Sequence, residues 1–230
     1  MKRFYKTVTV DQTPDGFRFL LDSKPVRTPA RQSLLLPTHA LADAVAQEWR
    51  EQEDEMRPAT MPLTRLVNTV LDGVRPTREE VISAILRFGE NDLLSYRAEA
   101  PEALVARQLR WNDYLDWVAD RYGARLAVTS GIQHVPQSGE ALAALRRAIA
   151  AQSDFDLAAL HVLASVTGSL VLGLAVLDGR LTSEEAFVLS RLDEAYQAEQ
   201  WGSDREAEER AGRLVAEMHH AAQLVRLARA

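Results

Sequence analysis

The segment Leu192–Asp204, LDEAYQAEQWGSD, contains the residue types of a binding surface. Two adjacent carboxylates, Asp193 and Glu194, precede Trp201 by about two helical turns. Gln197 lies between these carboxylates and Trp201. No His, Cys or Ser stands beside the carboxylates to form an activated nucleophile or a proton relay. We expect the helical face around these four residues to hold a partner through charged contacts over an aromatic floor, and not to catalyse a reaction.

Other interpretations of the carboxylates remain open. Asp193 and Glu194 follow the helix start predicted at Thr182 by several turns, so the helix dipole does not explain them, and a solvated helix face is the alternative. A rival hypothesis is a small-molecule enzyme that uses Asp92 or Glu194 as its general base. The sequence supplies no partner residue for such a base. A non-catalytic helical adaptor is a third possibility.

The four tryptophans, Trp49, Trp111, Trp117 and Trp201, mostly fall on predicted helix stripes, where packing in the core is the usual role. Trp49 precedes a dense acidic run and is a candidate to seal the junction between an N-terminal β unit and a helical body.

Several function classes are excluded by composition. The formal charge is −6, which opposes binding to nucleic acid phosphates, and there is no cysteine to form a thiolate metal site. The histidines have no spacing that favours a shared metal, and His161 is expected to lie in the core. Neither a G-x-S-x-G elbow nor a phosphate-binding glycine loop occurs. We therefore expect no metal, no cofactor and no enzymatic activity.

The segment Leu157–Leu177 is apolar and uncharged over a length that could span a bilayer. It carries polar residues within it, has no aromatic belt, and is flanked by aspartates instead of a basic cluster. These features favour a helix buried in the protein core, so we expect no membrane insertion.

The fold class expected is α+β, with a β unit over residues 1–36 and a helical domain over 37–230. Alternation at Lys6–Val10 and at Phe17–Leu21, separated by the turn sequence TPDG, predicts a hairpin. Short strands are also expected at Lys24–Thr28 and Ser33–Leu36. Beyond Pro37, apolar stripes predict helices.

Helix boundaries follow from capping signals. Capping boxes begin at Thr77, Thr182 and Ser203, and Pro101 opens a long helix that Gly123 ends. The segment 125–135 is a candidate for a short strand pair.

Several segments, taken in order, are similar to the assembly chaperone of the F-type ATP synthase that protects the unassembled α subunit, the mitochondrial complex assembly factor 2 type. The matching segments are RFYK, GFRFLLDSKPVRTPARQSLLLPTHALADAVAQEW, MPLTRLVNTVLDGV, DLLSYRA, GSLVLGLAV and LDEAYQAEQWGSD. They extend over nearly the whole chain, from about residue 3 to about residue 225.

This resemblance implies an ATP-independent holding function: transient binding of the α subunit through the surface it later presents to the β subunit. It marks Trp49 and one acid of the LDEAYQ segment, either Asp193 or Glu194, as important positions. Mitochondrial members carry a transit peptide before the matrix protein. The alternating N-terminal segment MKRFYKTVTVDQTPDGF, with early acids at Asp11 and Asp15, is expected to be neither a transit peptide nor a secretory signal. A bacterial homologue in the cytoplasm is therefore expected, with a mature organellar protein that has been trimmed as the alternative. A monomer is expected because a holding protein must expose its site.

Overall fold

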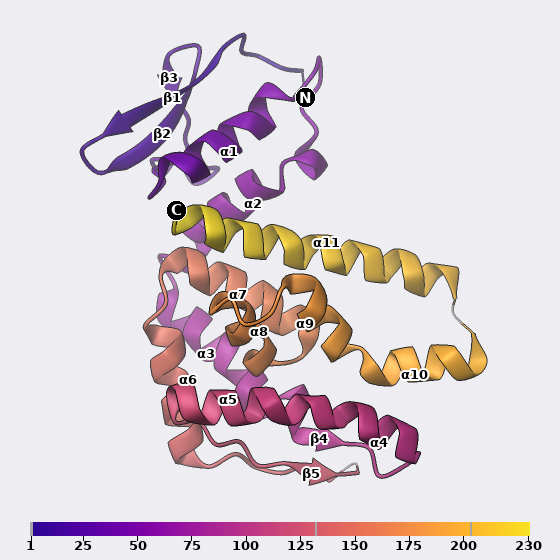
Figure 1. Ribbon diagram of the computed structural model, residues 1–230. Helices are drawn as coiled ribbons and strands as arrows, with labels where there is room; N and C mark the ends of the chain where they lie inside the picture. The colour runs from indigo at the N-terminus through magenta and orange to yellow at the C-terminus, as the bar shows by residue number, and fades with distance from the viewer. Residues whose placement is uncertain (1, 132, 203) are drawn as a thin grey trace. The chain divides into compact units, whose positions relative to one another are not determined.

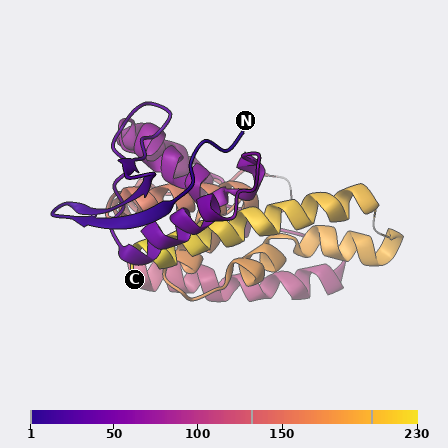
Figure 2. The same cartoon turned by 90° about the horizontal axis from the view of Figure 1, so that it is seen from above.

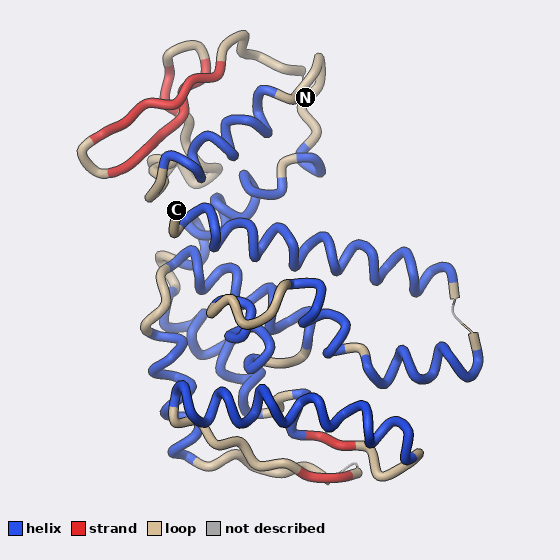
Figure 3. The backbone as a smooth tube through the Cα atoms, in the orientation of Figure 1, coloured by secondary structure: helices blue, strands red, loops and turns tan. Residues whose placement is uncertain are grey.

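An antiparallel three-stranded sheet precedes a mostly helical body in the computed structural model, which confirms the predicted α+β class (Figures 1 and 3). The structure describes residues 2–131, 133–202 and 204–230. The strands are β1 Val8–Thr13, β2 Gly16–Leu21, β3 Lys24–Pro25, β4 Tyr96–Arg97 and β5 Thr129–Ser130. The helices are α1 His39–Arg50, α2 Pro62–Thr69, α3 Arg78–Glu90, α4 Glu102–Gln108, α5 Asn112–Tyr122, α6 Gly139–Ala150, α7 Asp154–Thr167, α8 Leu170–Leu177, α9 Ser183–Ser190, α10 Leu192–Trp201 and α11 Arg205–Ala228.

Backbone contacts divide the chain into two compact units. The first contains residues 1–78, 154–158 and 223–230, and the second contains 79–153 and 159–222. The first unit thus combines the N-terminal third of the chain with the first turn of α7 and the end of α11. The predicted boundary at residues 36 and 37 stays a prediction.

The sheet of the first unit is built on the predicted hairpin. β1 pairs with β2 in antiparallel register from Val8–Leu21 to Thr13–Gly16, and α1 packs against both strands (Figure 1). Gly16 has a φ of +140°, and a Cβ there would lie 2.6 Å from the Leu36 carbonyl oxygen, so the turn requires glycine.

The prediction of two further strands is only partly correct. β3 is limited to Lys24–Pro25, and the Ser33–Leu36 segment forms isolated bridges, Arg27 with Ser33 and Phe17 with Leu36. Pro25 and Pro29 have no backbone N–H to donate to a ladder, which stops the pairing from extending.

The α1 and α2 helices lie beyond Pro37, where apolar stripes predict helices, and a π-helical turn, Val70–Val74, follows α2. Within that turn Asp72 accepts hydrogen bonds from the Thr28 hydroxyl at 2.6 Å and the Ala30 N–H at 3.0 Å. The π-helical turn therefore presents a carboxylate that anchors the loop after β3.

The apolar segment 157–177 is two helices and not the single buried helix predicted. α7 ends at Thr167, Gly168 takes a φ of +68°, and Ser169 caps α8 by accepting a hydrogen bond from the Leu172 N–H. Every residue of α8 is buried, as predicted, whereas His161 on α7 is exposed. The expectation of a core histidine is therefore wrong. The side chain lies on the solvent side of α7, where its ring contacts Phe88 edge-on.

Other helix and strand boundaries differ in detail from the predicted ones. A 3₁₀ turn, Leu109–Trp111, separates α4 from α5, and Gly123 ends α5 with a φ of +74° as predicted. Among its described residues, the segment 125–135 forms one strand, β5, whose parallel partner is β4 and not a second strand of the same segment. The capping box at Thr182 is confirmed. The predicted box at Ser203 lies outside the described residues.

Candidate functional site

The polypeptide changes direction at Arg191, so Asp193 and Glu194 lie in the first turn of a new helix, α10. Arg191 has φ −115° and ψ 23°, values that interrupt the helix that begins after Thr182. The expectation that the dipole does not explain these carboxylates is therefore wrong, because acids in a first turn are stabilised by the unpaired N–H groups there. The break also turns both residues toward the end of α7.

Both carboxylates line a cavity of about 410 Å³ in the second unit. Its walls come from the 3₁₀ turn Leu93–Ser95 that follows α3, the 3₁₀ turn before α5, the α7–α8 break, the end of α9 and the start of α10. This volume falls at the lower end of the range of roughly 300–1,000 Å³ that holds small ligands. The lining residues are Leu93, Trp111, Ser165, Val166, Thr167, Gly168, Ser190, Arg191, Asp193, Glu194 and Gln197.

Asp193 is held in a fixed position by a buried amide. Gln108, 1% exposed, donates from Nε2 to Asp193 Oδ1 at 2.7 Å, while its Oε1 accepts from the Ala98 N–H at 2.8 Å. Because both ends of the Gln108 amide are bonded, the half-buried carboxylate is oriented by a rigid neighbour.

Glu194 is paired differently. Its Oε1 accepts from Arg191 Nη1 at 2.8 Å, and Arg191 Nη2 donates to the Val166 carbonyl oxygen at 2.8 Å. The Glu194 side chain is exposed, so this ion pair is screened and contributes about 0–1 kcal/mol.

Trp201 ends α10 and is 80% exposed, so the core-packing interpretation fails for this tryptophan. Between the cavity and Trp201, α10 is anchored to α4 by Arg107, which bonds both oxygens of Glu199 and lies over the Tyr196 ring. Beyond it, α11 begins and runs back antiparallel to α10 (Figures 1 and 2). The structure thus brings Asp193, Glu194 and Gln197 to one cavity and places Trp201 at the far end of the same helix.

Trp49 lies in the first unit and takes a packing role there. Its ring centroid is 5.6 Å from those of Tyr5 and Phe19, and its Nε1 donates to the Thr64 hydroxyl at 3.1 Å. Trp111 is 1% exposed and donates to the Leu189 carbonyl oxygen, so core packing is confirmed for it.

Glu48, which carries no sequence signal of a functional site, is a buried acid of the first unit. Its carboxylate accepts from the N–H groups of Leu63 and Thr64 and from the Thr64 hydroxyl, and so caps α2 from another helix. Burial raises the pKa of Glu48, and these hydrogen bonds oppose the rise. A capping acid fifteen residues away in the sequence leaves no local signal.

Asp92, the second general-base candidate, is completely buried. It accepts hydrogen bonds from the Leu94 N–H, the Ser169 hydroxyl and the Val171 N–H. Burial raises its pKa to about 6 against the effect of these bonds. A substrate has no access to this carboxylate, whose contacts fix the start of α8. Its geometry is that of a structural cap.

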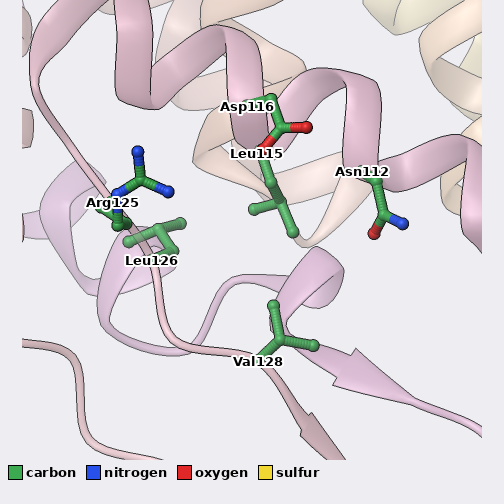
Figure 4. Close-up of a pocket in the computed structure, with 6 residues that line it drawn as sticks. All are labelled: Asn112, Leu115, Asp116, Arg125, Leu126 and Val128. Carbon is green, nitrogen blue, oxygen red and sulfur yellow. The ribbon is translucent and has the colours of Figure 1, made fainter.

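A second cavity, of about 250 Å³, lies between α5 and the segment that follows it (Figure 4). Leu115, Leu126 and Val128 supply its apolar surface, and Asn112, Asp116 and Arg125 are its polar residues. No cluster of three or more metal-binding side chains exists among the described residues, and no helix within those ranges has the length and apolarity needed to span a bilayer.

Comparison with known proteins identifies the family of the chain. Residues 2–119 match the family model described as ATP12 chaperone protein. The chain is 26% identical over 222 residues to the mitochondrial protein atp12 of Schizosaccharomyces pombe, covering 90% of this chain and 76% of that protein.

Solved structures agree. Atp12 from Paracoccus denitrificans superposes with a TM-score of 0.95 at 43% identity, over 99% of this chain and 98% of that one. The Atu1473 protein of Agrobacterium tumefaciens gives 0.92 at 46% identity, over 98% and 85%. These matches define the class as a chaperone. The chain belongs to the ATP12 family of ATP synthase assembly chaperones.

Proposed function

We propose that this protein holds the free α subunit of the F-type ATP synthase without using ATP and shields the surface that the α subunit later presents to the β subunit. The observation that supports this most directly is Trp201, 80% exposed on the helix that also carries the Asp193 and Glu194 carboxylates. Family membership gives the class of client, and α10 supplies a surface that could meet it.

The physical requirement is an apolar anchor combined with charges. An unpaired subunit interface is an exposed apolar patch that aggregates until it is covered. Exposed aromatic side chains commonly anchor such contacts, and surrounding charges set register and speed association. The α10 sequence, LDEAYQAEQW, contains three acidic and no basic side chains, so this helix attracts a basic client surface.

The remaining parts of the proposal follow from the holding function. A protein that exposes its site to a client acts as a monomer, makes and breaks no bond, and releases the α subunit when the β subunit arrives. We place it in the bacterial cytoplasm, where the α subunit is made. We propose that Trp49 supports the client site through the stability of its own unit, because it packs against Tyr5 and Phe19 there.

The test is capture of purified α subunit by tagged protein and by two matched charge reversals. Glu194→Lys changes the site, whereas Glu206→Lys makes the same charge change at an exposed position of α11. We expect about tenfold weaker capture by the first variant alone. Thermal unfolding should change little and to a similar extent in both, because each acid is exposed in the first turn of its helix. Absence of capture by the unmodified protein would refute the proposal.

A further inference from the structure

We propose that the cavity beside Asp193 receives a basic side chain, arginine or lysine, of the client, an inference that rests on the proposed function. The argument begins with charge. Of the lining residues, Arg191 carries a positive charge and Asp193 and Glu194 carry negative charges. Arg191 pairs with Glu194, and no ion pair joins Asp193 to a cation within the described residues. A half-buried carboxylate therefore remains uncompensated inside a cavity.

Asp193 has room for a further contact. Among the described residues its side-chain partner is the neutral amide of Gln108, which bonds one carboxylate oxygen and leaves the other available to a ligand. A bound cation would gain from a carboxylate that is already oriented and partly shielded from water.

The end of α7 adds to the same preference. Ser165, Val166 and Thr167 form the last turn of α7 and line the cavity, and the left-handed backbone at Gly168 stops the helix there. A helix C-terminus carries partial negative charge on its carbonyl groups and favours cations.

The contacts of Arg191 show that the end of α7 and the first turn of α10 together bind a guanidinium group. One of its nitrogens donates to Glu194 and another to the Val166 carbonyl oxygen, each at 2.8 Å. A second guanidinium or an ammonium group beside Asp193 would repeat this arrangement of a carboxylate next to the helix end.

The cavity also suits the stem of a basic residue. Leu93, Val166 and Trp111 contribute apolar surface, against which the methylene groups of arginine or lysine pack while the charged head reaches the carboxylate. Trp201 stands eight residues further along α10, roughly 12 Å away at the usual helical rise. A client surface with a basic residue near an apolar patch could engage both, which points to a protein side chain as the occupant and not a free amine.

The experiment pairs client capture with a direct probe of the cavity. Asp193→Asn keeps the oxygen that accepts from Gln108 and removes the charge, and Glu206→Gln removes the same charge from an exposed site without lining the cavity. We expect Asp193→Asn to weaken capture of the α subunit about tenfold and Glu206→Gln to leave it unchanged. Equal capture by Asp193→Asn and the unmodified protein overturns the inference while the proposed function stands.

The direct probe is Nα-acetyl-arginine amide, followed by shifts of the backbone amide resonances of the full chain. Shifts at Gly168, Arg191 and Gln197, absent with the neutral citrulline analogue and absent in Asp193→Asn, support the cavity even if the α subunit is not captured at all. Equal shifts with both analogues, or shifts elsewhere only, overturn it.

Discussion

Replacement of Glu48 by alanine should destabilise the protein by about 2–4 kcal/mol. The carboxylate accepts three hydrogen bonds, from the Leu63 N–H at 2.7 Å, the Thr64 N–H at 2.8 Å and the Thr64 hydroxyl at 2.7 Å. Met61, the residue before α2, supplies no side-chain cap. Alanine therefore leaves two buried N–H groups at the start of α2 without acceptors, each costing about 1–3 kcal/mol.

Two effects reduce the expected loss of stability below the full cost of the two N–H groups without acceptors. Burial raises the pKa of Glu48, which means that its charged form is penalised in the folded state, and alanine removes this penalty. Alanine also frees the Thr64 hydroxyl, which already accepts from Trp49 Nε1, to turn toward another acceptor. Both effects favour the variant and offset part of the loss.

The assay is equilibrium unfolding in urea, monitored by far-ultraviolet circular dichroism, with Glu51→Ala as the control for removing an exposed acid from the same helix end. The control should change the free energy of unfolding by less than about 0.5 kcal/mol. A Glu48→Ala loss as small as that of the control would refute the capping role.

Three further predictions concern Asp92, Trp49 and Gly16. Because the pKa of Asp92 is raised to about 6, the folded state binds this proton more tightly than the unfolded chain, so its contribution to the free energy of unfolding falls by up to about 3 kcal/mol as pH rises from about 4 to about 6. The stability advantage of the unmodified protein over Asp92→Asn should shrink over that window, and a constant difference in urea melts at several pH values would argue against it. Trp49→Phe keeps the ring but loses the bond to Thr64, and should lower the free energy of unfolding by about 1 kcal/mol with no loss of client capture per folded molecule. Gly16→Ala should cost at least about 1–3 kcal/mol, measured by thermal unfolding, because its Cβ meets a backbone carbonyl oxygen and its φ is unfavourable for alanine.

Elements with local signals are the ones that could be predicted from the sequence. The TPDG turn between two alternating segments specifies the β1–β2 hairpin, and Thr182 with Glu185 specifies the start of α9. Both features depend on residues within a few positions of each other. The breaks at Gly168 and Arg191 depend on tertiary contacts, since Asp92, distant in sequence, bonds the start of α8.

The candidate site shows the same division. Its residues Asp193, Glu194, Gln197 and Trp201 could be named because they lie close together in one segment. Its geometry could not be predicted, because the cavity depends on Leu93, the end of α7 and the Gln108 amide. Gln108 is 85 residues away from Asp193 in the sequence. Tryptophan is a residue type that often contacts binding partners, but the packing of Trp49 against Tyr5 and Phe19 becomes visible only in the folded unit.

The measurement that tests the central claim most directly is the light scattering of purified α subunit diluted from denaturant, with and without this protein. We expect an equimolar amount to suppress aggregation without ATP, and Trp201→Ala to suppress it much less at an unchanged melting temperature, because that side chain is 80% exposed and contributes little to folding. Scattering that rises as fast with the unmodified protein as with buffer alone would contradict the claim.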